Sequence, residues 1–125
     1  MTPATDILLI EDEPNIAEAV RFILSRDGWK LEHWPEGGKA MARIAALRPR
    51  LVILDVMLPV LSGLEILETL RADPDLAATP VLMLTARGVS GRGAIITDAA
   101  DRLLAKPFDN AELCGIVTEM LGEPE

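Results

Sequence analysis

The chain has 125 residues, a length that suits one domain with its own hydrophobic core. Half of the residues are apolar but only 3% are aromatic, so the core must consist mainly of aliphatic side chains. The formal net charge is −8, and Lys and Arg form no cluster along the sequence. Because an acidic surface repels phosphate backbones, this composition argues against direct nucleic-acid binding.

Cysteine content and apolar run lengths indicate where the protein works. Cys114 is the single cysteine, which excludes an internal disulfide and fits a reducing compartment. It stands in an amphipathic C-terminal stretch, where we expect a small core residue. The first six residues are too short and too uncharged for a signal peptide, and no apolar run approaches a membrane span. The sequence therefore predicts a cytoplasmic protein that does not enter a membrane.

Short apolar runs of strand length alternate with segments whose apolar residues recur at helical spacing. In chain order, these patterns predict a strand at 7–10, a helix at 15–25, a strand at 30–34, a helix at 39–47, a strand at 51–54, a helix at 64–72, a strand at 81–84, a helix at 91–99, a strand at 103–105 and a helix at 110–121. The fourth helix is the poorest of the five, because Gly91 and Gly93 lower its helical propensity.

The predicted strands are mostly continuous apolar runs, which is typical of parallel strands covered by helices on both faces. The run at 30–34 alternates instead, which places that strand nearer an edge. Repeated strand–helix units indicate an α/β fold with right-handed crossovers. We therefore predict one domain over residues 1–125 with a doubly wound, five-stranded parallel sheet of order 2-1-3-4-5, the flavodoxin-like (βα)5 architecture. In such sheets, ligands bind beyond the carboxyl ends of the first and third strands.

Polar residues follow four of the predicted strands. Glu11 and Asp12 come after the first strand, Asp55 after the third, Thr85 after the fourth and Lys106 after the fifth. The first and third strands would be neighbours about 4.8 Å apart, so the three carboxylates would crowd together. They would repel one another unless one takes up a proton or a cation lies among them. Because the candidate ligands are hard oxygens, the sequence predicts a Mg²⁺ site, with Mn²⁺ as a possible substitute.

The same residues predict a phosphoryl-acceptor site. The Asp55 carboxylate can act as a nucleophile and form an acyl phosphate, and such a transfer depends mainly on positioning and charge neutralisation. Lys106 supplies a cation for one phosphoryl oxygen, and the Thr85 hydroxyl supplies a hydrogen-bond donor for another. Taken singly, each residue also has a structural explanation. An Asp at a strand end often caps the next helix, but here that helix starts several residues later. For Glu13, we prefer a solvated position beside the first helix.

Four segments that carry these residues resemble one family, and the resemblance spans nearly the whole chain. The segments are ILLIEDE at 7–13, LVILDVMLP at 51–59 with Ser62-Gly63, PVLMLTAR at 80–87, and Lys106-Pro107-Phe108. Together they resemble the receiver domain of response regulators in two-component signal transduction. On this resemblance the chain looks like a single-domain response regulator.

The resemblance implies a role for each residue that would meet the phosphoryl group. Asp55 would accept it from the phosphohistidine of a histidine kinase or a histidine phosphotransfer protein. Thr85 and Lys106 would contact it, and the Lys106–Pro107 peptide bond would be cis. Such a domain is a switch that assists its own phosphorylation and dephosphorylation, rather than an enzyme with an external substrate. It would signal through contacts with a downstream protein.

The resemblance also implies a ligand set for the metal ion. Asp12, Asp55 and the backbone carbonyl of Met57 would bind Mg²⁺, and Glu11 would help directly or through a water molecule. Few protein ligands leave room for water and for a phosphoryl oxygen, as Mg²⁺ prefers.

The chain departs from the family pattern in two places. Leu103 stands where many members carry Tyr or Phe, three residues before the lysine, and the segment between Thr85 and Lys106 is slightly short and carries three glycines. Ordinary family variation explains both departures as well as a modified output face does. We hypothesise that signalling uses the segment 88–93 and the fourth helix instead of an aromatic switch.

Several other functions compete with this interpretation. A phosphatase of the haloacid-dehalogenase type needs a second Asp two residues after the nucleophile, where this chain has Met57. A nucleotide-binding P-loop needs G-x-x-x-x-G-K-[ST], which the chain lacks. A receiver-like scaffold that is never phosphorylated, and a phosphate shuttle or sink, remain open alternatives. The sequence identifies neither the kinase, nor the downstream partner, nor the oligomeric state.

Overall fold

The computed structural model describes residues 5–56, 58, 62–86, 100–106 and 108–122. Its elements in chain order are β1 (Ile7–Ile10), α1 (Pro14–Arg26), β2 (Leu31–Trp34), α2 (Ala40–Leu47), β3 (Leu51–Asp55), α3 (Gly63–Ala72), β4 (Val81–Ala86), β5 (Arg102–Lys106) and α5 (Asn110–Leu121). All nine agree with their predicted bounds within two residues. The predicted helix at 91–99 and the segment 88–93 lie outside the described residues.

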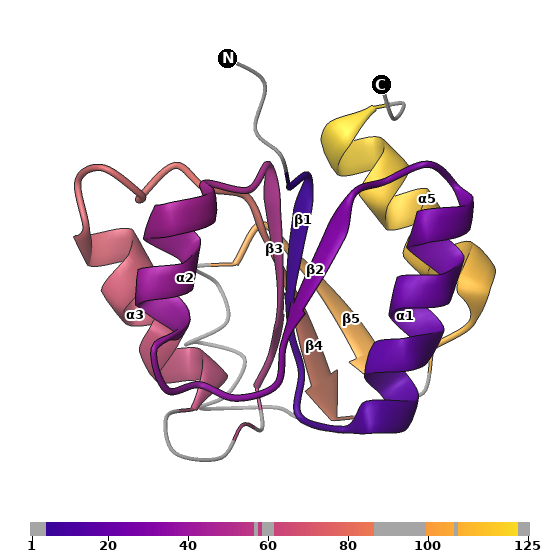
Figure 1. Ribbon diagram of the computed structural model, residues 1–125, viewed down its shortest axis with the longest axis horizontal. Coiled ribbons are helices and arrows are strands. Elements are labelled where there is room, and N and C mark those ends of the chain that lie inside the picture. Colours follow the sequence, from indigo (N-terminus) through magenta and orange to yellow (C-terminus); the bar gives the residue numbers. More distant parts are fainter. Residues whose placement is uncertain (1–4, 57, 59–61, 87–99, 107, 123–125) are drawn as a thin grey trace.

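The five strands form one parallel sheet in the order β2-β1-β3-β4-β5, which confirms the predicted doubly wound topology. β1 and β3 are neighbours, with Ile10 opposite Leu54 in the register. The strand with the alternating pattern, β2, is an edge strand, as predicted. Because all strands run the same way, their carboxyl ends meet at one edge of the sheet, the lower edge in Figure 1.

Helices cover both faces of the sheet: α1 and α5 lie on one side, and α2 and α3 on the other (Figure 1). Alternate strand residues therefore enter two separate cores. The core beneath α1 and α5 includes Ile7, Leu9, Val20, Leu24, Ile53, Leu82, Leu84, Leu113 and Val117. The core beneath α2 and α3 includes Leu8, Ile10, Ile44, Val52, Leu54, Ile66, Leu70 and Met83. Since the central strands are buried on both faces, polar side chains appear only where these strands end.

Side-chain caps and one glycine fix several helix ends. Asp109 caps α5 and forms a reciprocal capping box with Glu112. Ser62 caps α3 by accepting a hydrogen bond from the Glu65 amide. Gly28 follows α1 with a φ of 104°, a conformation that other residues rarely adopt. Within the described part of the chain, no helix is both long and apolar enough to cross a bilayer.

Cys114 lies on α5 at the margin of the core beneath α1 and α5. It is half-buried, so the predicted packing is correct although the burial is incomplete. Burial, with a smaller contribution from the nearby Asp27, raises the pKa of the Cys114 thiol to about 11. The thiol is therefore protonated near neutral pH and is a poor nucleophile.

Candidate functional site

The sheet brings the predicted site residues to a single edge. Glu11 and Asp12 directly follow β1, Asp55 is the last residue of β3, and Lys106 is the last residue of β5. Thr85 is the second-last residue of β4, one position beyond the register partner of Asp55. All five thus lie at the carboxyl edge, beside the junction of β1 and β3. That junction is the switch point of the sheet, where ligands of such folds bind.

Three carboxylates form a compact group at this edge. One oxygen each from Glu11, Asp12 and Asp55 lies within 4.8 Å of the others. Glu11 is 0% exposed and Asp55 is 2% exposed, whereas Asp12 reaches solvent. The cluster is therefore open on the Asp12 side and closed on the side of the sheet. The predicted crowding of acidic groups is present in the fold.

Lys106 bridges two of these carboxylates. Its Nζ lies 3.0 Å from Oε1 of Glu11 and 3.1 Å from Oδ2 of Asp55. Burial alone would lower the pKa of the Lys106 ammonium, but its close contacts with the Glu11 and Asp55 carboxylates outweigh burial and raise the pKa. Lys106 is therefore a fixed positive charge. Among the described residues, Lys106 is the one cation in contact with this group of three acidic residues, so this part of the cluster carries an excess of negative charge.

The pKa of Glu11 is shifted by its burial and by the neighbouring acidic group. Burial, reinforced by the neighbouring Asp55 carboxylate, raises the pKa of Glu11 from 4.5 to about 7. Its Oε2 accepts a hydrogen bond from the Glu13 amide at 3.0 Å, which works in the opposite direction. Its Oε1 is buried and, despite the Lys106 ammonium 3.0 Å away, has no partner with hydrogen-bond geometry among the described residues. The Lys106 ammonium offsets part of the cost of burying this oxygen, and a coordinating cation would offset more.

The donor set fits a hard divalent cation. Carboxylate oxygens are the ligands that Mg²⁺ prefers, and the buried Glu11 Oε1 supplies an oxygen whose bonding is incomplete. The exposed Asp12 gives water access to the cluster, which suits an ion that keeps several water ligands. A bound cation would also offset the excess of negative charge. The predicted carbonyl ligand, Met57, lies outside the described residues, as does Pro107 of the predicted cis bond.

The backbone at Asp55 is held by β4 and by the start of α3. The amide of Val56 donates to the carbonyl of Leu84, and the amide of Gly63 donates to the carbonyl of Val56, both at 3.0 Å. Gly63 packs so closely that a Cβ at this position would collide with the carbonyl oxygen of Asp55. Only glycine permits this approach. Gly63 therefore belongs to the architecture of the site. The sequence marked it only as part of the Ser62-Gly63 pair in the segment that resembles the family, without assigning it a role.

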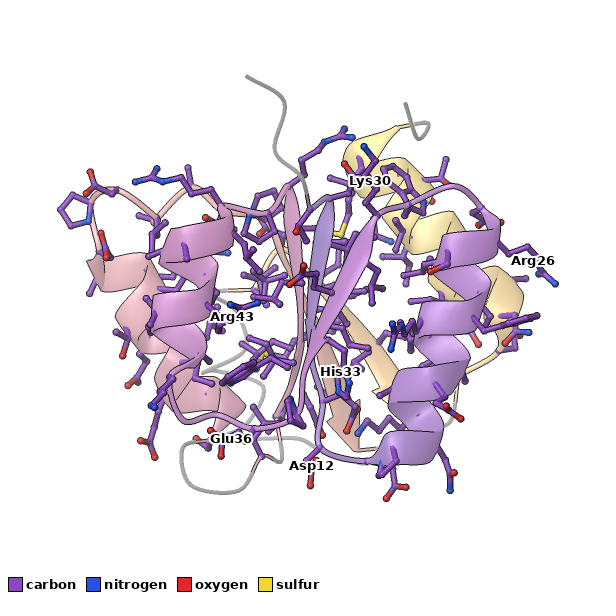
Figure 2. All side chains as sticks on the ribbon, viewed as in Figure 1. Asp12, Arg26, Lys30, His33, Glu36 and Arg43 are labelled. Carbon is purple, nitrogen blue, oxygen red and sulfur yellow. The ribbon has the colours of Figure 1, made fainter. Side chains whose placement is uncertain are left out.

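A second residue that the sequence did not single out is His33, on β2. Its Nε2 lies 2.7 Å from the carbonyl oxygen of Glu11. His33 and Asp12 lie at the same end of the sheet in Figure 2. A single histidine on an edge strand carries no motif, so only the fold brings it to the site.

Leu103, at the position of the missing aromatic residue, lies on β5 and is 48% exposed. Thr85 on the adjacent strand is 8% exposed. The two side chains thus differ sharply in burial. The segment 88–93 and the fourth helix, which we hypothesised to transmit the signal instead of an aromatic residue, lie outside the described residues.

Fold and site together define a class of small α/β protein, a doubly wound parallel sheet with an acidic cluster and a lysine at its switch point. The family model of the response regulator receiver domain matches residues 7–118. The chain belongs to this family, so it is a response regulator receiver domain of two-component systems, as the sequence resemblance predicted.

Relatives and solved structures agree with this assignment. The chain is 41% identical over 109 residues to the probable transcriptional regulatory protein TcrX of Mycobacterium tuberculosis, covering 86% of this chain and 45% of that protein. It thus spans about half the length of the curated relatives it matches. A putative response regulator from Chloroflexus aurantiacus is 31% identical, with a TM-score of 0.87 over 98% of this chain and 100% of that one. The receiver domain of the sensor histidine kinase PA1611 from Pseudomonas aeruginosa, solved with magnesium in its active-site cleft, is 29% identical, with a TM-score of 0.85 over 96% and 99%.

Proposed function

We propose that residues 1–125 form one receiver domain that accepts a phosphoryl group on Asp55, in a reaction that depends on Mg²⁺. The donor is the phosphohistidine of a histidine kinase or a histidine phosphotransfer protein. The observation that carries this proposal is the geometry of Asp55: a buried carboxylate, 3.1 Å from the Lys106 ammonium, within a cluster of three acidic groups. Two buried carboxylates that share one lysine cost folding free energy, which favours a ligand role for this edge over a purely structural one.

The transfer assigns a separate task to each side chain. An Asp55 carboxylate oxygen attacks phosphorus, the P–N bond of the phosphohistidine breaks, and the imidazole leaves with the bonding electrons. Lys106 neutralises one phosphoryl oxygen, and the Thr85 hydroxyl donates a hydrogen bond to another. The product is an acyl phosphate on Asp55.

Glu11, Asp12, Asp55 and the Met57 carbonyl would hold Mg²⁺, directly or through water. When bound, the ion neutralises charge on the phosphoryl oxygens and lowers repulsion between the phosphoryl group and the carboxylates. Asp12, the exposed member, would also keep water beside the acyl phosphate. We expect the domain to assist its own dephosphorylation for this reason. Mn²⁺ offers similar chemistry and serves as a test of metal selectivity.

We propose that output passes through contacts with a downstream protein in the cytoplasm. Relatives such as TcrX are transcriptional regulators of about twice this length, whereas the acidic surface of these 125 residues argues against direct nucleic-acid contact. A phosphate shuttle or sink would need only the acceptor chemistry. Leu103 is exposed and has no hydroxyl to form an inward hydrogen bond, so it cannot act as an aromatic switch. This observation favours a phosphate shuttle or sink as the second candidate function.

The test is phosphorylation by acetyl phosphate with Mg²⁺, followed by intact-mass measurement. The native protein should gain one phosphoryl group, and Asp55→Asn should gain none because the isosteric amide is a poor nucleophile. Asp75→Asn, which alters an exposed aspartate far from this edge, is the matched control and should label fully. Equal labelling of Asp55→Asn would place the acceptor elsewhere. No labelling of the native protein would favour the unphosphorylated scaffold.

A further inference from the structure

The backbone of Glu11 is clamped by β2 from two directions. The Glu11 amide donates to the carbonyl of Trp34 at 3.1 Å, and the Glu11 carbonyl accepts from the ring of His33 at 2.7 Å. A carbonyl oxygen can only accept, so Nε2 of His33 must carry the hydrogen. β1 itself ends at Ile10, so these two bonds extend the grip of the sheet onto the acidic segment.

The bond from His33 acts on the peptide unit that joins the two adjacent acidic residues. The Glu11 carbonyl and the Asp12 amide share one rigid plane. Holding the carbonyl oxygen therefore fixes the direction in which Asp12 leaves the strand. Among the described residues, no hydrogen bond or ion pair holds the Asp12 side chain, which is exposed. The orientation of Asp12 thus depends on its backbone.

Mg²⁺ makes this orientation important. The ion demands near-ideal octahedral geometry with ligand distances of about 2.0–2.1 Å, so a small rotation of one carboxylate weakens binding. Groups outside the ligand set that orient ligands commonly change metal affinity by about 10–100-fold. The buried Glu11 side chain is already held by its own contacts. The orientation of the Asp12 carboxylate therefore depends more strongly on the backbone than that of Glu11.

We propose that His33 is a positioning residue for the metal site: its ring N–H holds the Glu11–Asp12 peptide in the orientation that binds Mg²⁺. The proposal rests on the proposed function, because it needs Glu11 and Asp12 to be metal ligands. His33 touches neither the metal nor the phosphoryl group, and acts through the peptide between two ligands.

Two substitutions separate the hydrogen bond from the bulk of the side chain. His33→Phe keeps a ring but removes the donor, whereas His33→Gln places an N–H at the same number of bonds from Cβ. We expect His33→Phe to raise the Mg²⁺ Kd about tenfold, measured by calorimetry, and His33→Gln to raise it less than about threefold. Labelling by acetyl phosphate at saturating Mg²⁺ should stay within about twofold of native in both variants, since binding and not chemistry is affected.

Control measurements distinguish an effect of His33 on Mg²⁺ binding from an effect on the stability of the fold. Glu32→Gln, one residue away with an exposed side chain, should leave the Mg²⁺ Kd unchanged. Urea unfolding in EDTA should give similar stabilities for His33→Phe and His33→Gln, although His33→Phe loses much more metal affinity. If His33→Phe does not fold, His33→Met offers a flexible side chain without a donor.

Two results would overturn the inference: an unchanged Kd in His33→Phe, or equal losses of affinity in the Phe and Gln variants. Absence of Mg²⁺ binding by the native protein would instead overturn the proposed function, and this inference with it. Failure of the inference alone leaves labelling of Asp55 intact, so the two failures give different data.

Discussion

The two edges of the sheet carry charged groups in opposite arrangements. At the amino edge, Asp6 accepts a hydrogen bond from the Lys30 amide at 2.9 Å and lies 3.8 Å from the Arg50 guanidinium. Arg50 also donates to the carbonyl of Leu121 at 2.9 Å and lies over the Trp29 ring at 5.5 Å. Asp6 and Arg50 thus each meet complementary partners. The network ties the end of α5 to the sheet.

The carboxyl edge is imbalanced by comparison. Among the described residues, Lys106 is the one cation beside Glu11, Asp12 and Asp55, and it pairs with Glu11 and Asp55. The buried Oε1 of Glu11 has no partner with hydrogen-bond geometry in the same part of the chain. The buried acidic groups therefore destabilise the carboxyl edge until a proton or a metal ion binds. Sites selected for ligand binding commonly carry such a cost, whereas structural networks do not. The comparison predicts that pH and metal act on the carboxyl edge, whereas substitutions at the amino edge change stability alone.

The largest expected effect is the response of the carboxyl edge to pH without metal. Burial raises the pKa of Glu11 from its ordinary value of 4.5 to about 7 in the folded protein. The folded protein therefore binds the extra proton, which stabilises it fully below pH 4.5 and is lost as pH rises through 7. The native protein should lose on the order of 3 kcal/mol across this range in EDTA, relative to Glu11→Gln. Urea unfolding at a series of pH values measures the difference.

Glu13→Gln, an exposed neighbour of the cluster, is the control and should follow the native pH profile. Saturating Mg²⁺ should flatten the difference between native protein and Glu11→Gln above pH 7, because the cation replaces the proton. If the difference in free energy of unfolding between native protein and Glu11→Gln does not change with pH in EDTA, then Glu11 is ionised throughout. The acidic cluster would then cost the fold less than we propose.

The next effect in size concerns the balanced edge. Arg50→Met keeps an apolar stem over Trp29 but removes the bond to the Leu121 carbonyl, the cation–π contact and the ion pair with Asp6. We expect a loss of about 2 kcal/mol in the free energy of unfolding, with an unchanged Mg²⁺ Kd. Arg48→Met, two residues earlier with an exposed side chain, should cost far less. An altered Kd in Arg50→Met would show that the two edges are coupled.

These two edges also show what the sequence could predict. The apolar runs fixed the strands within two residues, and the repeated strand–helix order led to the observed sheet. The acidic cluster followed from strand neighbours, because Asp55 and the Glu11–Asp12 pair each stand directly beyond a buried run. Such features depend on local pattern and topology, which a sequence contains.

Contacts between segments far apart in the chain could not be predicted in this way. The bond from His33 to the Glu11 carbonyl joins residues 22 positions apart, and that from Arg50 to Leu121 joins residues 71 apart. In both bonds the acceptor is a backbone carbonyl oxygen, which every residue has and which therefore leaves no signature in the sequence. The close approach of Gly63 to Asp55 depends on how α3 packs, and a glycine at a helix start has several explanations.

The smallest expected effect is the gain in stability when Mg²⁺ offsets the excess negative charge at the carboxyl edge. Mg²⁺ binds the assembled carboxylates and not the unfolded chain, so a concentration of ten times Kd should add about 1.4 kcal/mol, or roughly 5 °C in melting temperature. Asp12→Asn should shrink this gain, since it removes one ligand. In EDTA the same substitution should raise the melting temperature by roughly a degree or more, because it relieves repulsion among the three acidic groups.

The opposite signs in one variant make this test selective. A general loss of packing would lower the melting temperature with and without metal, whereas removal of a ligand from a strained cluster lowers it only with metal. Thermal unfolding in EDTA and in Mg²⁺, on native protein, Asp12→Asn and the exposed control Asp75→Asn, separates these cases. If Asp12→Asn is less stable in both conditions, then Asp12 stabilises the fold by itself. A native melting temperature indifferent to millimolar Mg²⁺ would mean that protons alone balance the carboxyl edge.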